Sequence, residues 1–286
     1  MTALKSLFWS SRPISWVNTA VPFAAAYFFA GGEIGIELIV LSLFFLIPYN
    51  LLMYGINDVF DYESDLRNPR KGGIEGALLA PELHRKTLLW SFGLAAPFVA
   101  YAVWVSLENL AALVVLVITI FAVIAYSVKG LRFKEVPFLD SITSSTHFVG
   151  PMLFGLLLSG AELGTSLLLA TAAFFLWGAA SHAFGAVQDI RADREAGIAS
   201  VATSLGARNT VRLAVALYLV AGLMLLALPD RFWQASFAAL PYLIVVGPQL
   251  AITDETCEQA NRGWRRFLLL NFLAGAWIMA LLIGPS

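Results

Sequence analysis

Long apolar runs, separated by charged residues, glycines and prolines, fill the chain from end to end. A helix that crosses a bilayer needs about 20 mainly apolar residues. A secretory signal is the alternative for the first run, because Lys5 and Arg12 precede it, but Asn18 and Pro22 interrupt its core, which favours a membrane helix. The pattern predicts nine membrane helices near 14–30, 36–57, 86–106, 110–128, 138–159, 165–188, 211–229, 234–252 and 266–284.

Composition supports an all-α membrane protein. Hydrophobic residues make up 59% of the 286 residues and charged residues 13%, against about 25% charged in ordinary soluble proteins. Nine helices leave no room for a large soluble domain, so we expect one membrane domain over 1–286. The net charge of −1 gives no basic field for nucleic acid, and the single Cys257 excludes an intrachain disulfide.

Basic residues predict the orientation, because loops rich in Lys and Arg stay in the cytoplasm. With a cytoplasmic N-terminus, 17 of the 18 Lys and Arg residues fall on the inner side, and only Arg231 falls outside. The longest loops, 58–85 and 189–210, are then both cytoplasmic. We therefore expect a multi-pass protein of the cell membrane with its chemistry on the cytoplasmic side.

A weak internal repeat relates the two halves of the chain. A shift of 131 residues sets Asn57-Asp58-Val59 over Gln188-Asp189-Ile190, each at the cytoplasmic end of an even-numbered helix. This match predicts two similar halves, about 14–128 and 138–284.

The strongest local signal is an acidic segment at the end of the second predicted helix. On a continuing helix, its oxygen-bearing side chains share one face. Clustered carboxylates repel one another, and an all-oxygen set suits a hard divalent cation such as Mg²⁺, with Mn²⁺ as a substitute. A solvated acidic loop is the alternative, but it needs no such spacing. The predicted ligands are Asn57, Asp58, Asp61 and Asp65.

A second acidic pair follows the sixth predicted helix. Asp189 and Asp193 stand one turn apart, a spacing that by itself is typical of a helix end or a surface face. Paired with the first segment, they predict that two acidic segments hold Mg²⁺ and a diphosphate between them. Asp58, Asp61 and the second pair are therefore candidate catalytic residues.

Basic residues near these segments are candidate diphosphate contacts. Topology signalling and lipid headgroup contact are alternative explanations for each of them. Lys129 stands out because Tyr126 ends an apolar helix one turn before it, so we assign it a catalytic role. The other basic candidates are Arg67, Arg70, Lys71, Arg132, Arg191 and Arg194.

Polar residues inside apolar helices are costly and mark function or interhelical hydrogen bonds. Asn50 and Tyr54 extend the stripe of the first acidic segment into the membrane, and His182 stands two turns before Asp189. These three residues are candidate substrate contacts. Interhelical hydrogen bonding is the alternative for His182 and for the polar run Ser144 to His147.

These motifs resemble the UbiA superfamily of intramembrane prenyltransferases. The resemblance covers nearly the whole chain and rests on Arg12-Pro13 to Trp16, Asn57-Asp58…Asp61…Asp65, Tyr126…Lys129, and Asp189…Asp193 followed by Gly197. It implies nine helices around a central cavity, with two Asp-rich cytoplasmic cap loops over a Mg²⁺-bound prenyl diphosphate. It also implies that the six predicted ligands bind metal and diphosphate and that Lys129 contacts the diphosphate.

Two stretches resemble the lycopene elongase branch of this superfamily: Ser11 to Trp16, and Tyr54 to Asn57 with Lys71 to Ala77. The branch implies transfer of a dimethylallyl group from its diphosphate to lycopene. Many quinone-forming relatives carry an Arg-Pro pair where this chain has Gly72-Gly73-Ile74-Glu75-Gly76, which favours a non-aromatic acceptor. Prenylation of an aromatic or quinone precursor remains the alternative, and a cation transporter is a minor one. The residues indicate no particular partner subunit.

Overall fold

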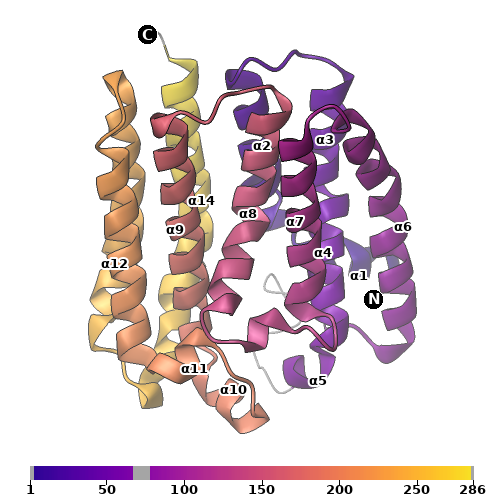
Figure 1. Cartoon of the computed structure of the whole chain (residues 1–286). Helices are drawn as coiled ribbons and strands as arrows, with labels where there is room; N and C mark the ends of the chain where they lie inside the picture. Colours follow the sequence, from indigo (N-terminus) through magenta and orange to yellow (C-terminus); the bar gives the residue numbers. More distant parts are fainter. Residues whose placement is uncertain (1–2, 67–77, 285–286) are drawn as a thin grey trace. The chain divides into compact units, whose positions relative to one another are not determined.

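A computed structural model describes residues 3–66 and 78–284 (Figure 1). Within this part of the chain every element is a helix. The elements up to the middle of the chain are α1 (Ala3–Ser10), η1 (Pro13–Ser15), α2 (Val17–Phe29), α3 (Ile36–Leu46), α4 (Pro48–Phe60), α5 (Tyr62–Asp65), α6 (Pro81–Val105), α7 (Leu110–Ser127), η2 (Phe133–Glu135) and α8 (Leu139–Leu158). The later ones are α9 (Thr165–Val187), α10 (Ile190–Ala196), α11 (Val201–Leu205), α12 (Ala207–Leu225), η3 (Asp230–Ala239), α13 (Leu240–Val246), η4 (Gly247–Ala251), η5 (Asp254–Gln259) and α14 (Ala260–Ile283).

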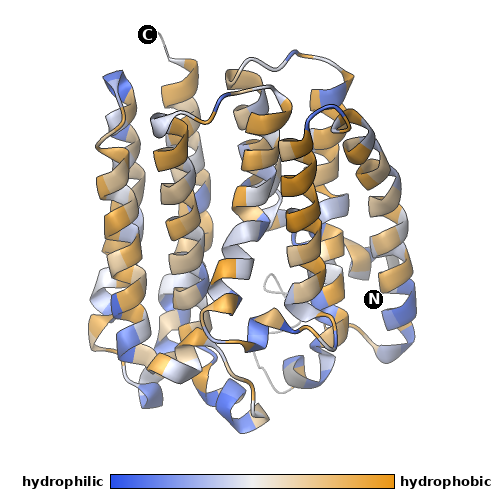
Figure 2. Ribbon diagram, in the orientation of Figure 1, coloured by the Kyte–Doolittle hydropathy of each residue, from blue (hydrophilic) through white to orange (hydrophobic). Residues whose placement is uncertain are grey.

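Eight helical stretches among the described residues are long and apolar enough to cross a membrane. Figure 2 shows apolar residues along these helices and more polar ones toward many helix ends and connections. The eight stretches are Ile36–Phe60, Pro81–Val105, Leu110–Ser127, Leu139–Leu158, Thr165–Val187, Ala207–Leu225, Asp230–Ala251 and Asp254–Ile283.

The first predicted helix is shorter than expected. The chain makes a 3-10 turn at η1, and α2 begins only after it. Helix α2 has 13 residues, so its length is about 20 Å at 1.5 Å per residue. The hydrocarbon core of a bilayer is about 30 Å thick. All-helical architecture is thus confirmed for the described residues, while the count of nine membrane helices stays a prediction.

The second predicted helix is broken in two. Pro48 begins α4 and has no backbone N–H, so the chain bends at Ile47 between α3 and α4. Asn50 compensates for the break, because its Nδ2 lies 2.8 Å from the carbonyl oxygen of Phe45 and 3.1 Å from that of Leu46. Nδ2 also lies 2.7 Å from Oγ1 of Thr19 on α2. Asn50 of α4 therefore connects the end of α3 and α2 through side-chain hydrogen bonds.

The remaining differences concern one helix end, the type of one helix and one predicted loop. Helix α6 begins at Pro81, five residues before the predicted 86, because a proline suits the first turn of a helix. The predicted helix at 234–252 is instead 3-10 helix for much of its length, with only α13 in α-helical form. The predicted loop 189–210 contains α10 and α11.

Residue contacts divide the chain into two compact units. The first comprises Met1–Phe133 with Gly150–Ala161, and the second comprises Lys134–Val149 with Glu162–Ser286. The predicted repeat relationship between two halves stays a prediction.

An aromatic cluster forms the core of the first unit. The ring centroids of Phe23 and Phe45 lie 4.9 Å apart, and Phe45 lies 5.2 Å from Tyr49. Phe154 of α8 stacks on Phe23 at 6.0 Å. Gly155 permits this close packing, because a Cβ there would lie 2.7 Å from the backbone oxygen of Phe23.

The second unit has its own aromatic core. Tyr218 of α12 stacks on Tyr242 of α13 at 5.2 Å, and Tyr242 lies 5.5 Å from Phe267 of α14. The buried hydroxyls are hydrogen-bonded: Tyr218 to Ser181, and Tyr242 to Asn271, each at 3.0 Å. Buried polar groups need such partners in an apolar interior.

Candidate functional site

The first acidic segment spans the end of α4 and the short helix α5. Asp61 separates the two helices, yet the amide of Asp61 bonds to the carbonyl of Asn57 and that of Asp65 to the carbonyl of Asp61, at 2.9 and 2.8 Å. The four-residue helical spacing is therefore kept from Asn57 to Asp65. The side chains of Asp58, Asp61 and Asp65 are all buried.

Arg12 is the charge partner of Asp58. Its Nη2 lies 2.8 Å from Oδ1 of Asp58, and its guanidinium lies 4.6 Å from the ring centroid of Tyr54. Burial lowers the pKa of Arg12, but the charges of Asp58, Tyr54 and Asp65 and the hydrogen bond to Asp58 together outweigh it and raise the pKa above its ordinary value. Arg12 therefore stays a cation. An arginine is thus one positive partner of the clustered carboxylates, while the predicted Mg²⁺ stays a prediction.

Asp61 has partners from α4 and from the chain after α7. Nδ2 of Asn57 lies 2.6 Å from Oδ2 of Asp61 and 3.0 Å from Oγ of Ser127. Nη2 of Arg132 lies 3.9 Å from Oδ1 of Asp61, and its Nη1 lies 3.5 Å from the carbonyl oxygen of Phe60. The structure thus brings the predicted residues Asn57, Asp61 and Arg132 together.

The predicted pair Tyr126 and Lys129 lies at the end of α7. Tyr126 is half-buried near the end of the helix, and Lys129 is exposed just after it. Gly130 follows with φ of 98°, a conformation that glycine accepts readily, and Arg132 is also left-handed. This turn lets the chain leave α7 and return Arg132 to the first acidic segment.

The second acidic segment begins where α9 ends. Asp189 precedes α10, and the amide of Asp193 bonds to the carbonyl of Asp189 at 2.8 Å. Both carboxylate side chains are half-buried. Gly197 ends α10 with φ of 70°, and the Ile198 amide reaches the Asp193 carbonyl at 2.8 Å, which closes the helix end. The segment is therefore a short ordered helix.

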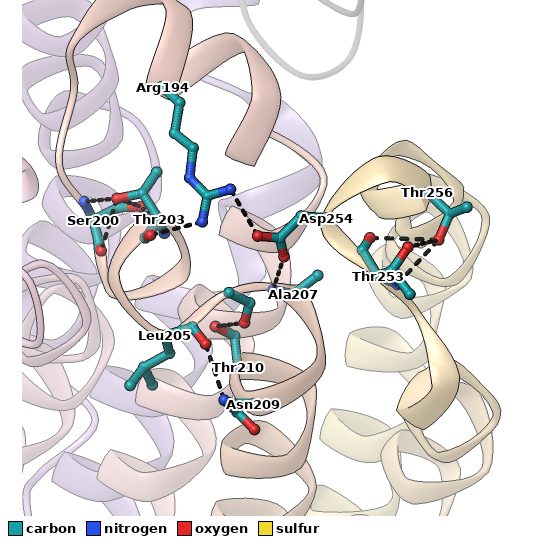
Figure 3. A network of polar contacts seen from close by, with 11 residues as sticks. Arg194, Ser200, Thr203, Leu205, Ala207, Asn209, Thr210, Thr253, Asp254 and Thr256 are labelled. Atoms are coloured by element: carbon teal, nitrogen blue, oxygen red, sulfur yellow. Dashed lines mark hydrogen bonds and ion pairs between the residues drawn. The ribbon is translucent and has the colours of Figure 1, made fainter.

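The basic residues of this segment have acidic partners. Nη1 of Arg194 lies 2.7 Å from Oδ2 of Asp254, and Nη1 of Arg191 lies 3.5 Å from Oε1 of Glu258 (Arg194 and Asp254 are drawn in Figure 3). These two predicted diphosphate contacts thus pair with carboxylates of η5.

His182 lies on α9, half-buried, with its Nδ1 3.0 Å from Oγ of Ser141 on α8. This is the interhelical hydrogen bond that was the alternative to a substrate role. The substrate role stays a prediction. Arg67, Arg70 and Lys71 lie outside the described residues, as does the stretch from Gly72 to Ala77.

The residue types suit a hard cation, since the two segments supply carboxylate and amide oxygens. Among the residues that the structure describes, however, no group of three or more Asp, Glu, His or Cys side chains is arranged to hold a metal. In the first segment, arginine and asparagine nitrogens contact the carboxylate oxygens instead.

Sequence reasoning did not identify four residues that contact the predicted site or its supporting helices. They share a polar side chain whose partner is distant in the chain, so spacing alone gives no signal for them. For Arg12, the Arg-Pro pair ahead of the first helix was a usable signal. The four are Arg12, Ser127, Asp140 and Asp254.

Comparison with solved structures supports the fold. A UbiA homolog from Archaeoglobus fulgidus, bound to DMAPP and Mg²⁺, superposes with a TM-score of 0.69 at 19% identity. The match covers 95% of this chain and 99% of that one.

Sequence relatives are closer. The C(50) beta-cyclic carotenoids biosynthesis protein LbtBC of a Dietzia species is 55% identical over 95% of this chain, which spans 63% of that relative's length. The lycopene elongase/hydratase of Corynebacterium glutamicum is 49% identical, over 99% of this chain and 98% of its own length. Residues 19–275 match the UbiA prenyltransferase family. With this match over most of its length and its many long apolar helices, the chain is a multi-pass membrane enzyme that belongs to the UbiA prenyltransferase family.

Proposed function

We propose that this chain transfers a dimethylallyl group from dimethylallyl diphosphate to the end of lycopene. The observation that carries this proposal is the identity of 55% and 49% to relatives named for C50 carotenoid synthesis and for lycopene elongation, over nearly the whole chain. The similar fold of a UbiA homolog that binds DMAPP and Mg²⁺ supports the choice of donor.

The metal and diphosphate site combines the two acidic segments. Six residues would hold Mg²⁺ and, through it, the diphosphate: Asn57, Asp58, Asp61, Asp65, Asp189 and Asp193. Bound Mg²⁺, or Mn²⁺ in its place, supplies positive charge that stabilises the leaving diphosphate. Two features support this assignment. All six side chains offer oxygen atoms as ligands, and the backbone of each segment is an ordered helix.

Basic residues of the chain complete the charge balance. Lys129 and Arg132 neutralise negative charge on the diphosphate as the bond from carbon to oxygen breaks, and Arg67, Arg70 and Lys71 contribute to the same task. Arg132 supports this role, because it already lies near Asp61. Tyr126, Tyr54, Asn50 and His182 line the path of the substrates.

The reaction then needs an apolar enclosure. The allylic cation forms as diphosphate leaves, adds to the terminal double bond of lycopene, and generates a tertiary cation. That cation loses a proton to give an alkene, or takes up water and releases a proton to give an alcohol. Apolar surroundings keep water from reaching the first cation too early. The name elongase/hydratase of the Corynebacterium relative is consistent with either ending.

The topology follows the same proposal. Nine helices surround a central cavity, with the N-terminus in the cytoplasm and both acidic segments in cap loops on that side of the cell membrane. The distribution of Lys and Arg supports this orientation. It places the acidic segments where a soluble diphosphate donor reaches them.

Product mass tests the acceptor. Membranes containing the chain are incubated with Mg²⁺, dimethylallyl diphosphate and lycopene. In a parallel incubation 4-hydroxybenzoate or a naphthoate replaces lycopene, and product masses are determined by mass spectrometry. We expect lycopene with one or two added five-carbon units, each with or without one water. Prenylated aromatic product without any lycopene adduct overturns the lycopene proposal and supports the aromatic alternative.

A further inference from the structure

Two aspartates outside both acidic motifs bind the backbone that follows Asp189 and Asp193. Asp140 is the second residue of α8 and is completely buried. Its Oδ1 accepts a hydrogen bond from the amide of Ser141, and its Oδ2 accepts one from the amide of Val201, each at 2.7 Å. Val201 is the first residue of α11. Asp140 therefore attaches the start of α11 to α8.

Asp254 attaches the other end of the same segment, as Figure 3 shows. Its Oδ1 accepts a hydrogen bond from the amide of Ala207, the first residue of α12, at 2.6 Å. Its Oδ2 lies 2.7 Å from Nη1 of Arg194 on α10, and Nη2 of Arg194 donates to the carbonyl of Thr203 on α11 at 3.0 Å. The carboxylate of Asp254 thus joins α10 to α12, and its partner Arg194 extends the connection to α11.

Helix ends explain why carboxylates occupy these two positions. The first amides of a helix lack partners within it and carry partial positive charge, so a carboxylate stabilises them. Ser200 and Thr203 already form a capping box at α11. Asp140 adds a buried acceptor to it.

Gly206 gives independent support for the contact with Asp254. A Cβ at Gly206 would lie 3.2 Å from Oδ1 of Asp254, and its φ of 76° suits glycine. The backbone before α12 therefore leaves room for the carboxylate. Both contacts join residues more than 40 positions apart, since 61 positions separate Asp140 from Val201 and 47 separate Asp254 from Ala207.

We propose that Asp140 and Asp254 are positioning residues that hold α10 and α11 in one conformation, so that Asp189 and Asp193 are presented to the diphosphate and its cation in a fixed arrangement. Neither touches the substrate in this scheme. The expected effect on catalysis rests on the proposed function. The expected effect on the backbone of 190–206 does not, because it is measured without any reaction.

Asparagine variants test the proposal without removing volume. Asp254→Asn leaves one acceptor oxygen for Arg194 and Ala207, so one of these two contacts is lost. Asp140→Asn likewise leaves one acceptor oxygen for the amides of Ser141 and Val201. Arg194→Gln removes the positive charge that pairs with Asp254. Glu258→Gln is the matched control, because its pairing with Arg191 is exposed and longer, at 3.5 Å.

Hydrogen exchange of the purified full-length chain in detergent is the first measurement, and it needs no activity. We expect amides in 190–206 to exchange about tenfold faster in the three variants than in the wild type or in Glu258→Gln, the effect of losing one hydrogen bond to a charged group. Exchange in the membrane-crossing part of α12 and in α9 should stay unchanged. Unchanged exchange in 190–206, or faster exchange spread equally over these helices, overturns the proposal.

Kinetics provides the second measurement. We expect the KM for dimethylallyl diphosphate and the Mg²⁺ concentration for half-maximal rate to rise about tenfold, with the KM for lycopene unchanged. Equal losses for both substrates indicate a general folding defect and count against positioning. If Asp140→Asn does not insert into membranes, the kinetics of Asp254→Asn and the hydrogen exchange of Asp254→Asn and Arg194→Gln still decide the question. Arg194→Gln is left out of the kinetic comparison, because Arg194 is itself a candidate diphosphate contact. A chain inactive toward lycopene but with localised exchange supports positioning and rejects only the proposed acceptor.

Discussion

Nη2 of Arg12 lies 2.8 Å from Oδ1 of Asp58, although the two residues are 46 positions apart. The Asp58 side chain is fully buried and that of Arg12 is 15% exposed. Arg12 adopts a left-handed backbone conformation, with φ of 49° and ψ of 72°, just before η1. The ion pair therefore fixes the N-terminal segment against α4 at the start of the first acidic segment.

Arg12→Gln should destabilise the protein, because it leaves the Asp58 carboxylate buried without its cation. Breaking a buried ion pair in this way typically costs about 3–5 kcal/mol. Thermal unfolding in detergent checks this. The Tm of Arg12→Lys should lie between that of Arg12→Gln and that of the wild type. The double variant Arg12→Gln, Asp58→Asn should recover part of the loss. A Tm for Arg12→Gln equal to that of the wild type contradicts a stabilising pair.

Most helices could be predicted from the sequence because apolar runs end at charged residues and glycines. The run predicted at 165–188 is α9 at Thr165–Val187, and the run at 110–128 is α7 at Leu110–Ser127. The break at Pro48 was missed because the apolar run continues through it. The 3-10 form of Asp230–Ala239 was missed because hydropathy reports burial in lipid and not the hydrogen-bond pattern.

The acidic motifs could be predicted from local spacing, but their partners could not. Asp61 and Asn57 are one turn apart, so their contact follows from helix geometry. The partners Arg12 and Arg132 come from other parts of the chain, and only the folded structure brings them to Asp58 and Asp61. The same holds for Asp254, which had no motif around it. The metal-binding and catalytic roles themselves stay predictions.

Gly155→Ala should destabilise the first unit. The added Cβ meets the backbone oxygen of Phe23 at 2.7 Å, and backbone cannot move aside as a flexible side chain can. Overpacking of this kind costs about 1–3 kcal/mol. The matched control is Gly93→Ala on α6, where nothing lies within 4 Å. Thermal unfolding of the two variants provides the measurement. Equal Tm values for Gly155→Ala and Gly93→Ala contradict tight packing of α8 on α2.

Asp58→Ala and Asp189→Ala should each lower the rate at least about 100-fold, because each removes a proposed ligand of the cation that stabilises the leaving diphosphate. Insertion into membranes should persist. Glu63→Ala is the matched control, since Glu63 is exposed in the same acidic segment and is not a proposed ligand. Removal of divalent cations should abolish turnover, and Mg²⁺ or Mn²⁺ should restore it. Near wild-type turnover of either aspartate variant argues against a site built from both segments.

Lys129→Ala should raise the KM for dimethylallyl diphosphate about tenfold and leave that for lycopene unchanged, because a cation contributes to binding an anion and not a hydrocarbon. Steady-state rates with each substrate varied in turn provide the measurement. Lys86→Ala removes another exposed basic residue, near the start of α6, and serves as the control. The same KM for the donor in both variants contradicts a diphosphate contact and leaves topology signalling as the explanation for Lys129.

The order in which products form should reveal how lycopene reaches the site. Lycopene has two equivalent ends and no polar group, so its binding depends on apolar and aromatic contact area. One proposed metal site reacts with one end at a time, and the other end reacts only after the molecule is released and turned round. A time course should therefore show the five-carbon adduct before the ten-carbon adduct. Excess lycopene should then compete with the released first adduct and lower the fraction of the second, as measured by mass spectrometry at equal donor consumption. Early formation of the ten-carbon adduct without the five-carbon one, or a ratio independent of lycopene concentration, contradicts release between the two transfers.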